Sequence, residues 1–242
     1  METKTYSSKP KIAVVILAGG VGSRLLSRNL PKQLIKIYDK YVISYCLDIY
    51  QNICDIDHIV LVINENFRTL FEKIVSDGNY TKVRKMVTGG RFRQNSVFNG
   101  ISSVDPCDFV IIQNGVSIFT PQELILECIE KAKTHKVVSA FVYEPYSSFM
   151  CIDNKIKTAL DRSMLGHVRD PQVFDHTLLL RVHTEANKKG MMHFTNDIFL
   201  LKKFGHEVYV VESNANNFKI TTDMDIKLAE MIIKGGLRKY VL

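Results

Sequence analysis

The sequence predicts an α/β fold in which a mostly parallel sheet is covered by helices on both faces. Short apolar runs of strand length alternate along the chain with stretches in which apolar residues recur at helical spacing. The first apolar run leads directly into a glycine-rich loop, as happens at the carboxyl edge of such sheets. A chain of 242 residues can bury one core, so we expect a single domain over residues 1–242.

The expected elements follow one another in a strand–helix order that is typical of a Rossmann-like sheet. The apolar runs that predict strands are residues 12–17, 58–63, 109–113, 137–143 and 207–211. Helical spacing is found over residues 43–52, 67–76, 93–103, 122–134, 178–189, 196–204 and 223–234. Thr120-Pro121-Gln122-Glu123 has the form of a capping box, and Thr222 is expected to cap the last helix.

One segment, residues 144–172, does not follow this alternation. It contains short strand-like stretches and turns, and it is too long for a plain loop in a compact domain. We expect a protruding β-arm that packs on a second subunit, which predicts a homodimer. The alternative is an irregular cap over the site of the same subunit.

The glycine-rich loop, Leu-Ala-Gly-Gly-Val-Gly-Ser-Arg over residues 17–24, predicts a phosphate-binding site. Backbone N–H groups at the end of a strand suit phosphate oxygens, and Arg24 and Lys32 add positive charge. The spacing excludes two familiar loops. Leu25 stands where a dinucleotide fingerprint needs its third glycine, and the chain has no Gly-Lys pair for a P-loop. The remaining pattern, with Pro31-Lys32-Gln33 after it, indicates a nucleoside triphosphate.

Composition narrows the classes of partner and location. The net charge of +7 suits anionic ligands, but the basic residues are scattered and not interleaved with aromatics, so we expect small anions and no nucleic acid. No apolar run approaches the ~20 residues of a membrane span, so no membrane association is expected. Five scattered cysteines and a polar N-terminal stretch predict a reduced, cytoplasmic protein.

Four further segments complete a pattern with the glycine-rich loop: Gly89 to Val97, Asp161-Arg162 with Pro171-Gln172, Thr195-Asn196-Asp197, and Asn217 to Thr222. In this order and spacing, the chain resembles the cytidylyltransferases that act on polyol phosphates. These include 2-C-methyl-D-erythritol 4-phosphate cytidylyltransferase and ribitol-5-phosphate cytidylyltransferase. The resemblance covers about residues 11–233 and implies a nucleotidyltransferase fold. It also implies a reaction in which CTP and a small phosphorylated polyol give a CDP-polyol and pyrophosphate.

The resemblance implies roles for individual residues. Residues implied to bind the nucleotide are Leu17, Ala18, Gly19, Gly20, Gly22, Gly90, Ser96 and Asn114. Arg24, Lys32 and Lys219 are implied to surround the α-phosphate as catalytic residues, where charge stabilisation and alignment matter most. Arg162 and Thr195 are implied to hold the phosphate of the acceptor, with Arg162 reaching across a dimer.

The chain departs from the family pattern at several of these positions. Asn114 stands where the family has an aspartate that helps to hold Mg²⁺, and Ser117 stands where it has an arginine. Asp170-Pro171-Gln172 replaces Thr-Pro-Gln. An amide oxygen can bind a hard cation but adds no charge, so Mg²⁺ is expected to be held weakly and mainly by the triphosphate. None of the remaining carboxylates, Asp161, Asp170 and Asp197, aligns with the missing acid.

Other classes of function fit parts of the sequence. Asn114 and Ser117 would also suit a nucleotide-binding homologue with weakened catalysis, and a nucleotidyltransferase with another phosphorylated acceptor stays open. Asp223-Met224-Asp225 has the D-x-D form found in glycosyltransferases. Because it opens a predicted helix, we interpret it as N-terminal helix charge.

Overall fold

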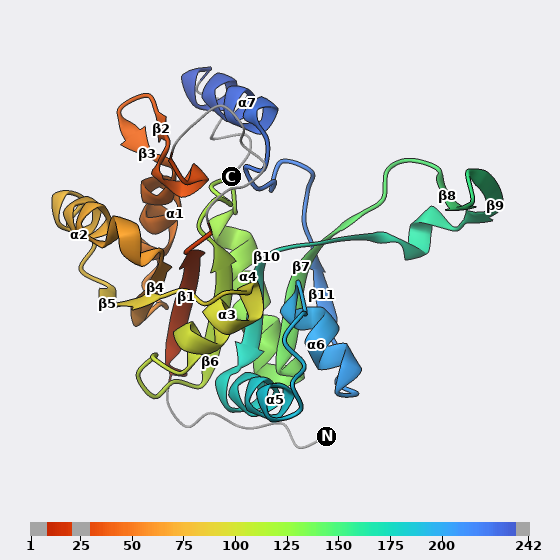
Figure 1. Ribbon diagram of the computed structural model, residues 1–242, viewed down its shortest axis with the longest axis horizontal. Helices are drawn as coiled ribbons and strands as arrows, with labels where there is room; N and C mark the ends of the chain where they lie inside the picture. The colour runs from red at the N-terminus through yellow and green to blue at the C-terminus, as the bar shows by residue number, and fades with distance from the viewer. Residues whose placement is uncertain (1–8, 21–29, 236–242) are drawn as a thin grey trace.

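The computed structural model describes residues 9–20 and 30–235, and its main feature is one seven-stranded sheet with helices on both faces (Figure 1). The strands lie in the order β11-β7-β10-β6-β1-β4-β5. Their bounds are β1 Ile12–Ala18, β4 His58–Ile63, β5 Val83–Thr88, β6 Phe109–Asn114, β7 Val137–Tyr143, β10 Gly166–Asp175 and β11 Tyr209–Glu212. The predicted mostly parallel α/β fold is confirmed, because β10 alone among these strands runs antiparallel to its neighbours.

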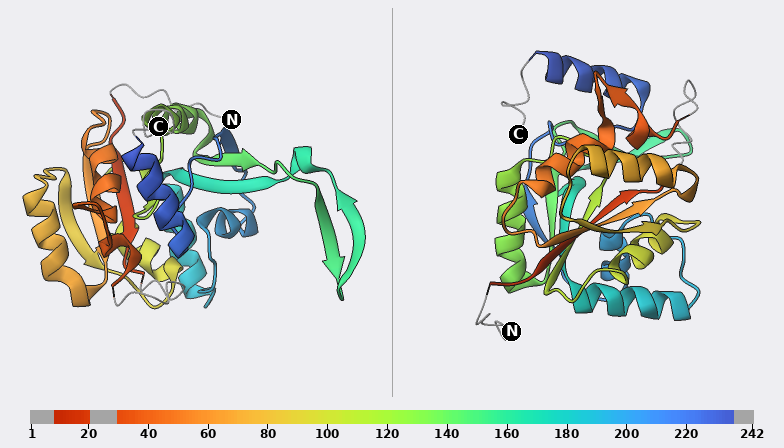
Figure 2. Two further views of the ribbon diagram at one scale, coloured as in Figure 1. Left: turned by 90° about the horizontal axis from the view of Figure 1, so that it is seen from above. Right: turned by 90° about the vertical axis from the view of Figure 1, so that its left-hand side faces the viewer.

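The helices form two layers that pack against opposite faces of the sheet (Figure 2). They are α1 Val42–Gln51, α2 Arg68–Asp77, α3 Arg93–Ile101, α4 Gln122–His135, α5 His176–Lys188, α6 Asp197–Lys203 and α7 Asp223–Lys234. Alternate residues of β1 point to opposite faces: Val14 and Ile16 join the core with α1, α2 and α4, whereas Val15 joins the core with α3, α5 and α6. Both faces of the sheet are therefore dry, as a buried parallel sheet requires.

Two strands of the seven-stranded sheet were not predicted from the sequence, and neither was the small separate pair β2 Lys36–Ile37 and β3 Lys40–Tyr41. The edge strand β5 contains Arg84 and Lys85, whose side chains reach solvent and pair with Asp105, so it lacks a continuous apolar run. The strand β10 contains His167, Arg169 and Asp170 and falls partly within the expected arm. The charged residues of the edge strand β5 break its apolar pattern, and the polar residues of β10 near the candidate site do the same there. Neither strand can therefore be predicted from an apolar run.

The arm is present, but it is shorter than predicted. A two-stranded hairpin, β8 Ser148–Ile152 with β9 Lys155–Leu160, extends far from the body of the molecule (Figures 1 and 2). Residues 166–172, which we expected in the arm, instead pair with β7 and β6 in the main sheet. We therefore define the arm as residues 144–165.

Of the two helix caps predicted from the sequence, only the one at Thr222 is present. Thr222 caps α7 by accepting a hydrogen bond from the Asp225 backbone N–H. The Asp225 carboxylate accepts from two backbone N–H groups, so Asp223 and Asp225 are N-terminal helix charge as predicted. The capping box at Thr120 was wrong: α4 begins after Pro121, and the Thr120 hydroxyl donates to Asn217 Oδ1 at 3.3 Å instead.

Candidate active site

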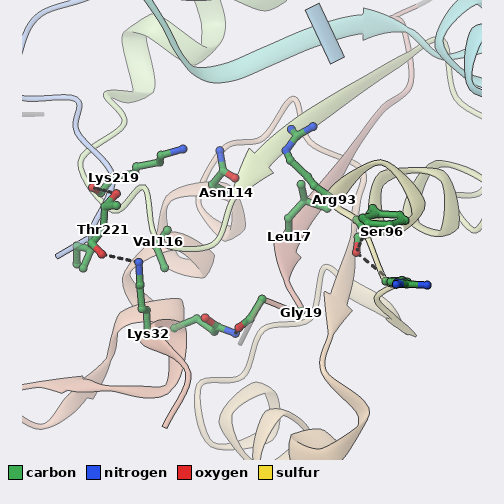
Figure 3. Close-up of a pocket in the computed structure, with 15 residues that line it drawn as sticks. Leu17, Gly19, Lys32, Arg93, Ser96, Asn114, Val116, Lys219 and Thr221 are labelled. Carbon is green, nitrogen blue, oxygen red and sulfur yellow. Dashed lines mark hydrogen bonds between the residues drawn. The ribbon is translucent and has the colours of Figure 1, made fainter. Parts of the chain in front are cut away.

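A cavity of about 450 Å³ opens at the carboxyl edge of the sheet, where β1 and β6 end side by side (Figure 3). The parallel register places Leu17 opposite Asn114, so the last residues of both strands reach the same rim. The cavity is lined by Leu17, Gly19, Gly20, Lys32, Gln33, Gly90, Arg91, Phe92, Arg93, Ser96, Asn114, Val116, Lys219, Ile220 and Thr221. These residues come from distant parts of the sequence and meet because the strand ends converge.

Two glycine loops form one wall of the cavity by touching each other across the end of β4. The Gly89 backbone N–H donates to the Ile63 carbonyl oxygen at 2.8 Å. A Cβ atom on Gly19 would lie 3.2 Å from that same oxygen. A side chain at position 19 would crowd this carbonyl oxygen, so glycine suits the close approach of the two loops. The packing holds both loops against the sheet at the rim where a nucleotide would sit.

Ser96 fixes the second glycine loop to the start of α3. Its hydroxyl accepts from the Gly90 backbone N–H at 3.0 Å and donates to the Phe92 carbonyl at 3.3 Å. Gly90 and Ser96 both line the cavity, as predicted, and they hold each other in place there. Their contact with a base stays a prediction.

Gln33, for which we predicted no individual role, is hydrogen-bonded to the first glycine loop. Its side-chain amide donates to the carbonyl oxygens of Ala18 and Gly20 at 2.5 and 2.9 Å. The side chain is buried, so these bonds are shielded from water. The Pro31-Lys32-Gln33 motif thus contributes structure through Gln33 as well as charge through Lys32.

Lys32 and Lys219 bring positive charge to the cavity from opposite ends of the chain (Figure 3). The buried Lys32 amine donates to the Thr221 carbonyl oxygen at 2.5 Å, which ties the segment around Lys219 to the loop after β1. Arg91 and Arg93 also line the cavity. Four basic side chains around one hollow suit a polyphosphate ligand.

Arg93 was not predicted as a site residue, although it lies in a quoted motif. Its guanidinium pairs with the buried Asp197 carboxylate at 2.7 Å, and His183 Nε2 lies 3.0 Å from the other oxygen of Asp197. Burial by itself raises the pKa of Asp197, but the charge of Arg93 and the hydrogen bond of His183 outweigh it and lower the pKa to about 2. The sequence did contain a sign of this role, because Arg93 begins the predicted helix and lies three residues before the predicted site residue Ser96.

A carboxylate from a distant part of the sequence lies beside Asn114, the position of the missing acid. Asp170 does not align with Asn114, yet its carboxylate oxygens lie 2.9 and 2.8 Å from Asn114 Nδ2. The Ser117 hydroxyl donates to the same carboxylate. Asp170 therefore lies next to Asn114 in space, although it does not align with the missing acid in sequence.

Most of the predicted site residues that the structure describes gather at this cavity. Leu17, Gly19, Gly20, Lys32, Gly90, Ser96, Asn114 and Lys219 line it, and Ala18 is buried beside them. Arg24 and Gly22 lie outside the described residues. Arg162 and Thr195 do not line the cavity: Arg162 is exposed at the base of the arm, where it donates to the Pro145 carbonyl at 3.1 Å, and Thr195 is exposed before α6. Their acceptor-binding roles stay predictions.

Among the described residues, acidic side chains that could bind a metal ion are scarce at the cavity. Within residues 9–20 and 30–235, no three His, Cys, Asp or Glu side chains are grouped so that they could hold one. Asp197 is paired with Arg93, and Asp161 caps a turn in the arm by accepting from Ser163. In the same residues, no helix has the length and apolar character of a membrane span.

Comparison with known proteins agrees with this geometry. The sequence model of the 2-C-methyl-D-erythritol 4-phosphate cytidylyltransferase family matches residues 12–235. The 2-C-methyl-D-erythritol 4-phosphate cytidylyltransferase of Clostridium tetani is 33% identical over 236 residues, which are 97% of this chain and 95% of that protein. The ribitol-5-phosphate cytidylyltransferase of Vibrio parahaemolyticus is 31% identical over 225 residues, 90% of this chain and 94% of that protein.

A solved structure shows the same architecture. The crystal structure of 4-diphosphocytidyl-2C-methyl-D-erythritol synthase from Anaerococcus prevotii superposes with a TM-score of 0.82 at 25% identity. The match covers 93% of this chain and 97% of that one. The predicted resemblance is confirmed in family and in fold.

Proposed function

The chain belongs to the 2-C-methyl-D-erythritol 4-phosphate cytidylyltransferase family and is a nucleotidyltransferase, and we propose that it joins CTP to a small phosphorylated polyol. The acceptor is of the ribitol-5-phosphate or methylerythritol-phosphate type, and the products are a CDP-polyol and pyrophosphate. The observation that carries the proposal is the meeting of two glycine loops with Lys32 and Lys219 at one cavity. Relatives named for either acceptor match this chain to a similar extent, so the acceptor class is left at polyol phosphates.

The proposed reaction needs alignment and charge rather than a protein nucleophile. A phosphate oxygen of the acceptor attacks the α-phosphorus of CTP in line, and the bond to the β-phosphate bridging oxygen breaks as pyrophosphate leaves. Negative charge grows on the oxygens around the α-phosphorus in the transition state. The amines of Lys32 and Lys219 stabilise that charge, and the glycine loops hold the triphosphate in register.

Magnesium is part of this proposal as an ion carried mainly by the triphosphate. Asn114 lines the cavity and offers a neutral carbonyl oxygen, which is a hard ligand that suits Mg²⁺. When bound there, such an ion would supply positive charge that neutralises the phosphate oxygens. Among the described residues, no group of three His, Cys, Asp or Glu side chains could hold a metal ion. Asn114 is therefore the one protein ligand that we propose for Mg²⁺ in this part of the chain.

Pyrophosphate release tests the proposed function directly. The purified chain is mixed with each of the four nucleoside triphosphates and with ribitol 5-phosphate, methylerythritol 4-phosphate or amino-alcohol phosphates. We expect release with CTP and one polyol phosphate. Release with no pair of substrates, alongside normal CTP binding, would instead support the second candidate, a nucleotide-binding homologue without turnover, which the neutral Asn114 and Ser117 favour.

CTP is expected to bind more tightly than ATP, GTP or UTP. The second glycine loop, from Gly89 to Ser96, is tied together by the Ser96 hydroxyl and lines the cavity, and we propose that it takes the small pyrimidine ring in place of a purine, with its backbone groups distinguishing the exocyclic amine of cytosine from the carbonyl of uracil. Calorimetric titration with the four nucleotides measures this preference. ATP binding as tight as CTP binding would reject the assignment of the base pocket.

The arm is proposed to make a homodimer. Tyr146, Phe149 and Ile156 are large apolar side chains that are 76%, 52% and 69% exposed on the arm. A projecting hairpin with apolar side chains on its surface is too small to bury them by itself, and a second copy of the arm or body would cover them.

We expect light scattering to give a mass of about 55 kDa, twice the chain mass of 27.6 kDa. Ile156→Asp is expected to shift the mass toward the monomer because it places a charge in the proposed interface. Lys157→Gln, which makes the same change in charge at an exposed position on the opposite face of the same strand, is the matched control for a general effect on the arm. A parent chain that stays monomeric over a wide concentration range would overturn the dimer.

We also propose a cytoplasmic location. The five cysteines are all free in the structure, and two of them, Cys46 and Cys128, are buried. Burial raises the pKa of the Cys128 thiol to about 12, which keeps it protonated and unreactive. Unpaired thiols of this kind suit a reducing compartment.

A further inference from the structure

The buried carboxylate of Asp170 contacts Asn114, which lines the cavity, but it has no role in the proposed reaction. Asp170 sits at an irregularity in β10, where the register with β7 shifts between Arg169 and Gln172, just before the residues that also pair with β6. The residue is 6% exposed and does not line the cavity. Asn217, itself buried, donates from its side-chain amide to the Asp170 backbone carbonyl at 2.6 Å. The backbone of Asp170 is therefore tied to the segment that leads to Lys219.

The Asp170 carboxylate faces two neutral hydrogen-bond donors. Asn114 Nδ2 lies within 2.9 Å of both carboxylate oxygens, and the Ser117 hydroxyl donates to Oδ2. Among the residues that the structure describes, no Lys, Arg or His lies within ion-pair distance of Asp170. The two donor groups satisfy the carboxylate oxygens through hydrogen bonds and carry no formal charge themselves, so Asp170 is the acidic group of this cluster.

The geometry allows only one orientation of the Asn114 amide. A carboxylate accepts hydrogen bonds and cannot donate, so the amide nitrogen must face Asp170. The carbonyl oxygen is then the polar atom that Asn114 presents to the cavity, and the charge behind it polarises the amide and makes that oxygen a stronger acceptor. Asn114 therefore presents its carbonyl oxygen to the cavity, and the Asp170 carboxylate lies on the far side of the same amide.

We propose that Asp170 is a positioning residue that locks the Asn114 carbonyl oxygen toward the cavity and supplies the negative charge that Asn114 itself lacks. The ligand of that oxygen is a cation or hydrogen-bond donor of the metal–nucleotide complex, so this part rests on the proposed function. The locking itself rests only on the contacts among Asn114, Ser117 and Asp170.

Exchanging the two side chains gives a sharp test. Asn114→Asp alone would set two carboxylates against each other, so we expect it to destabilise the protein although it adds an acid at the cavity. Asp170→Asn alone would remove the charge and release the amide orientation. In the double variant, the amide at position 170 would donate to the carboxylate at position 114, which restores a donor–acceptor pair and one negative charge.

The first measurement is the midpoint of thermal unfolding of the four proteins without any ligand. We expect each single exchange to lower the midpoint by about 3 °C or more and the double exchange to recover most of the loss. Midpoints that simply add would overturn the locking contact.

The second measurement is the rate against Mg²⁺ concentration at saturating CTP. We expect each single exchange to lower kcat and raise the magnesium requirement by about tenfold, and the double exchange to return both to within about threefold of the parent. Asp175→Asn is the matched control, because Asp175 is a buried acid of the same strand that caps α5. It is expected to lower the unfolding midpoint and to leave the magnesium requirement unchanged.

An Asp170→Asn variant that behaves like Asp175→Asn, less stable but with the magnesium requirement of the parent, would overturn the positioning role. Failure of the proposed function has a different signature, since the parent would then release no pyrophosphate with any substrate. In that case the ligand-free unfolding cycle decides whether the two side chains are coupled, and an absence of coupling overturns the inference.

Discussion

Replacing Lys32 or Lys219 with alanine is expected to lower kcat by about 100-fold or more while changing the affinity for CTP only a little. Both lysines line the cavity with the two glycine loops, so their amines can meet the charge that grows around the α-phosphorus. An interaction that strengthens in the transition state affects kcat, whereas one that is equal in the bound substrate affects KM. Steady-state kinetics with CTP separates these two effects.

The two lysines are expected to differ in stability. Lys32 is buried and donates to the Thr221 carbonyl, so Lys32→Ala also releases the segment that carries Lys219. Lys219 is exposed, and Lys219→Ala is expected to leave the unfolding midpoint unchanged. Lys202→Ala, at an exposed position of α6, is the control for loss of one positive charge. A change confined to KM, with kcat intact, would remove both lysines from the catalytic role.

Asp197→Asn is expected to cost about 3 kcal/mol or more of unfolding free energy, because it leaves the Arg93 guanidinium and His183 without a buried carboxylate. Arg93 lines the cavity, so its release is also expected to weaken CTP binding. Chemical denaturation and CTP titration measure the two effects. Asp77→Asn, which removes only the exposed Lys73 pair on α2, is expected to change the unfolding free energy by about 0.5 kcal/mol or less.

The same carboxylate gives a defined pH dependence. The pKa of Asp197 is lowered to about 2 in the folded state, so its contribution is fully present above the pKa of the unfolded chain, about 4. It is lost as the pH falls from about 4 to about 2, and it amounts to about 2 kcal/mol. The parent should therefore lose stability more steeply than Asp197→Asn in this window. Parallel stability curves between pH 5 and 2 would contradict this account.

Sequence reasoning recovered the frame of the fold because the frame depends on local patterns. Strands such as β1 and β4 are buried on both faces and therefore appear as unbroken apolar runs. It failed at β10, where Asp170 and Arg169 interrupt the pattern in a strand that lies in the middle of the sheet. The antiparallel direction of β10 follows from its entry through the arm, which no local pattern encodes.

The candidate site was predictable to the extent that motifs carry it. Lys32, Gly90, Ser96 and Lys219 are separated by up to 187 residues in sequence, and they gather because their motifs follow strand ends. Contacts across the sheet were not predictable in this way. Asp170 meets Asn114 only because β10 pairs with β6 in one particular register, and the sequence holds no record of that pairing.

The reversal at β10 has a consequence for how this protein can vary in length. The arm leaves from the end of β7 and returns into β10, and β7 and β10 are antiparallel neighbours closed at their base by the bond from the Glu144 N–H to the Leu165 carbonyl. An excursion between two such strands can be lengthened or trimmed by residue pairs without altering any register inside the sheet. The length of the hairpin can therefore change independently of the main sheet. Evolution can alter the surface that the hairpin presents while the strand ends at the cavity keep their positions.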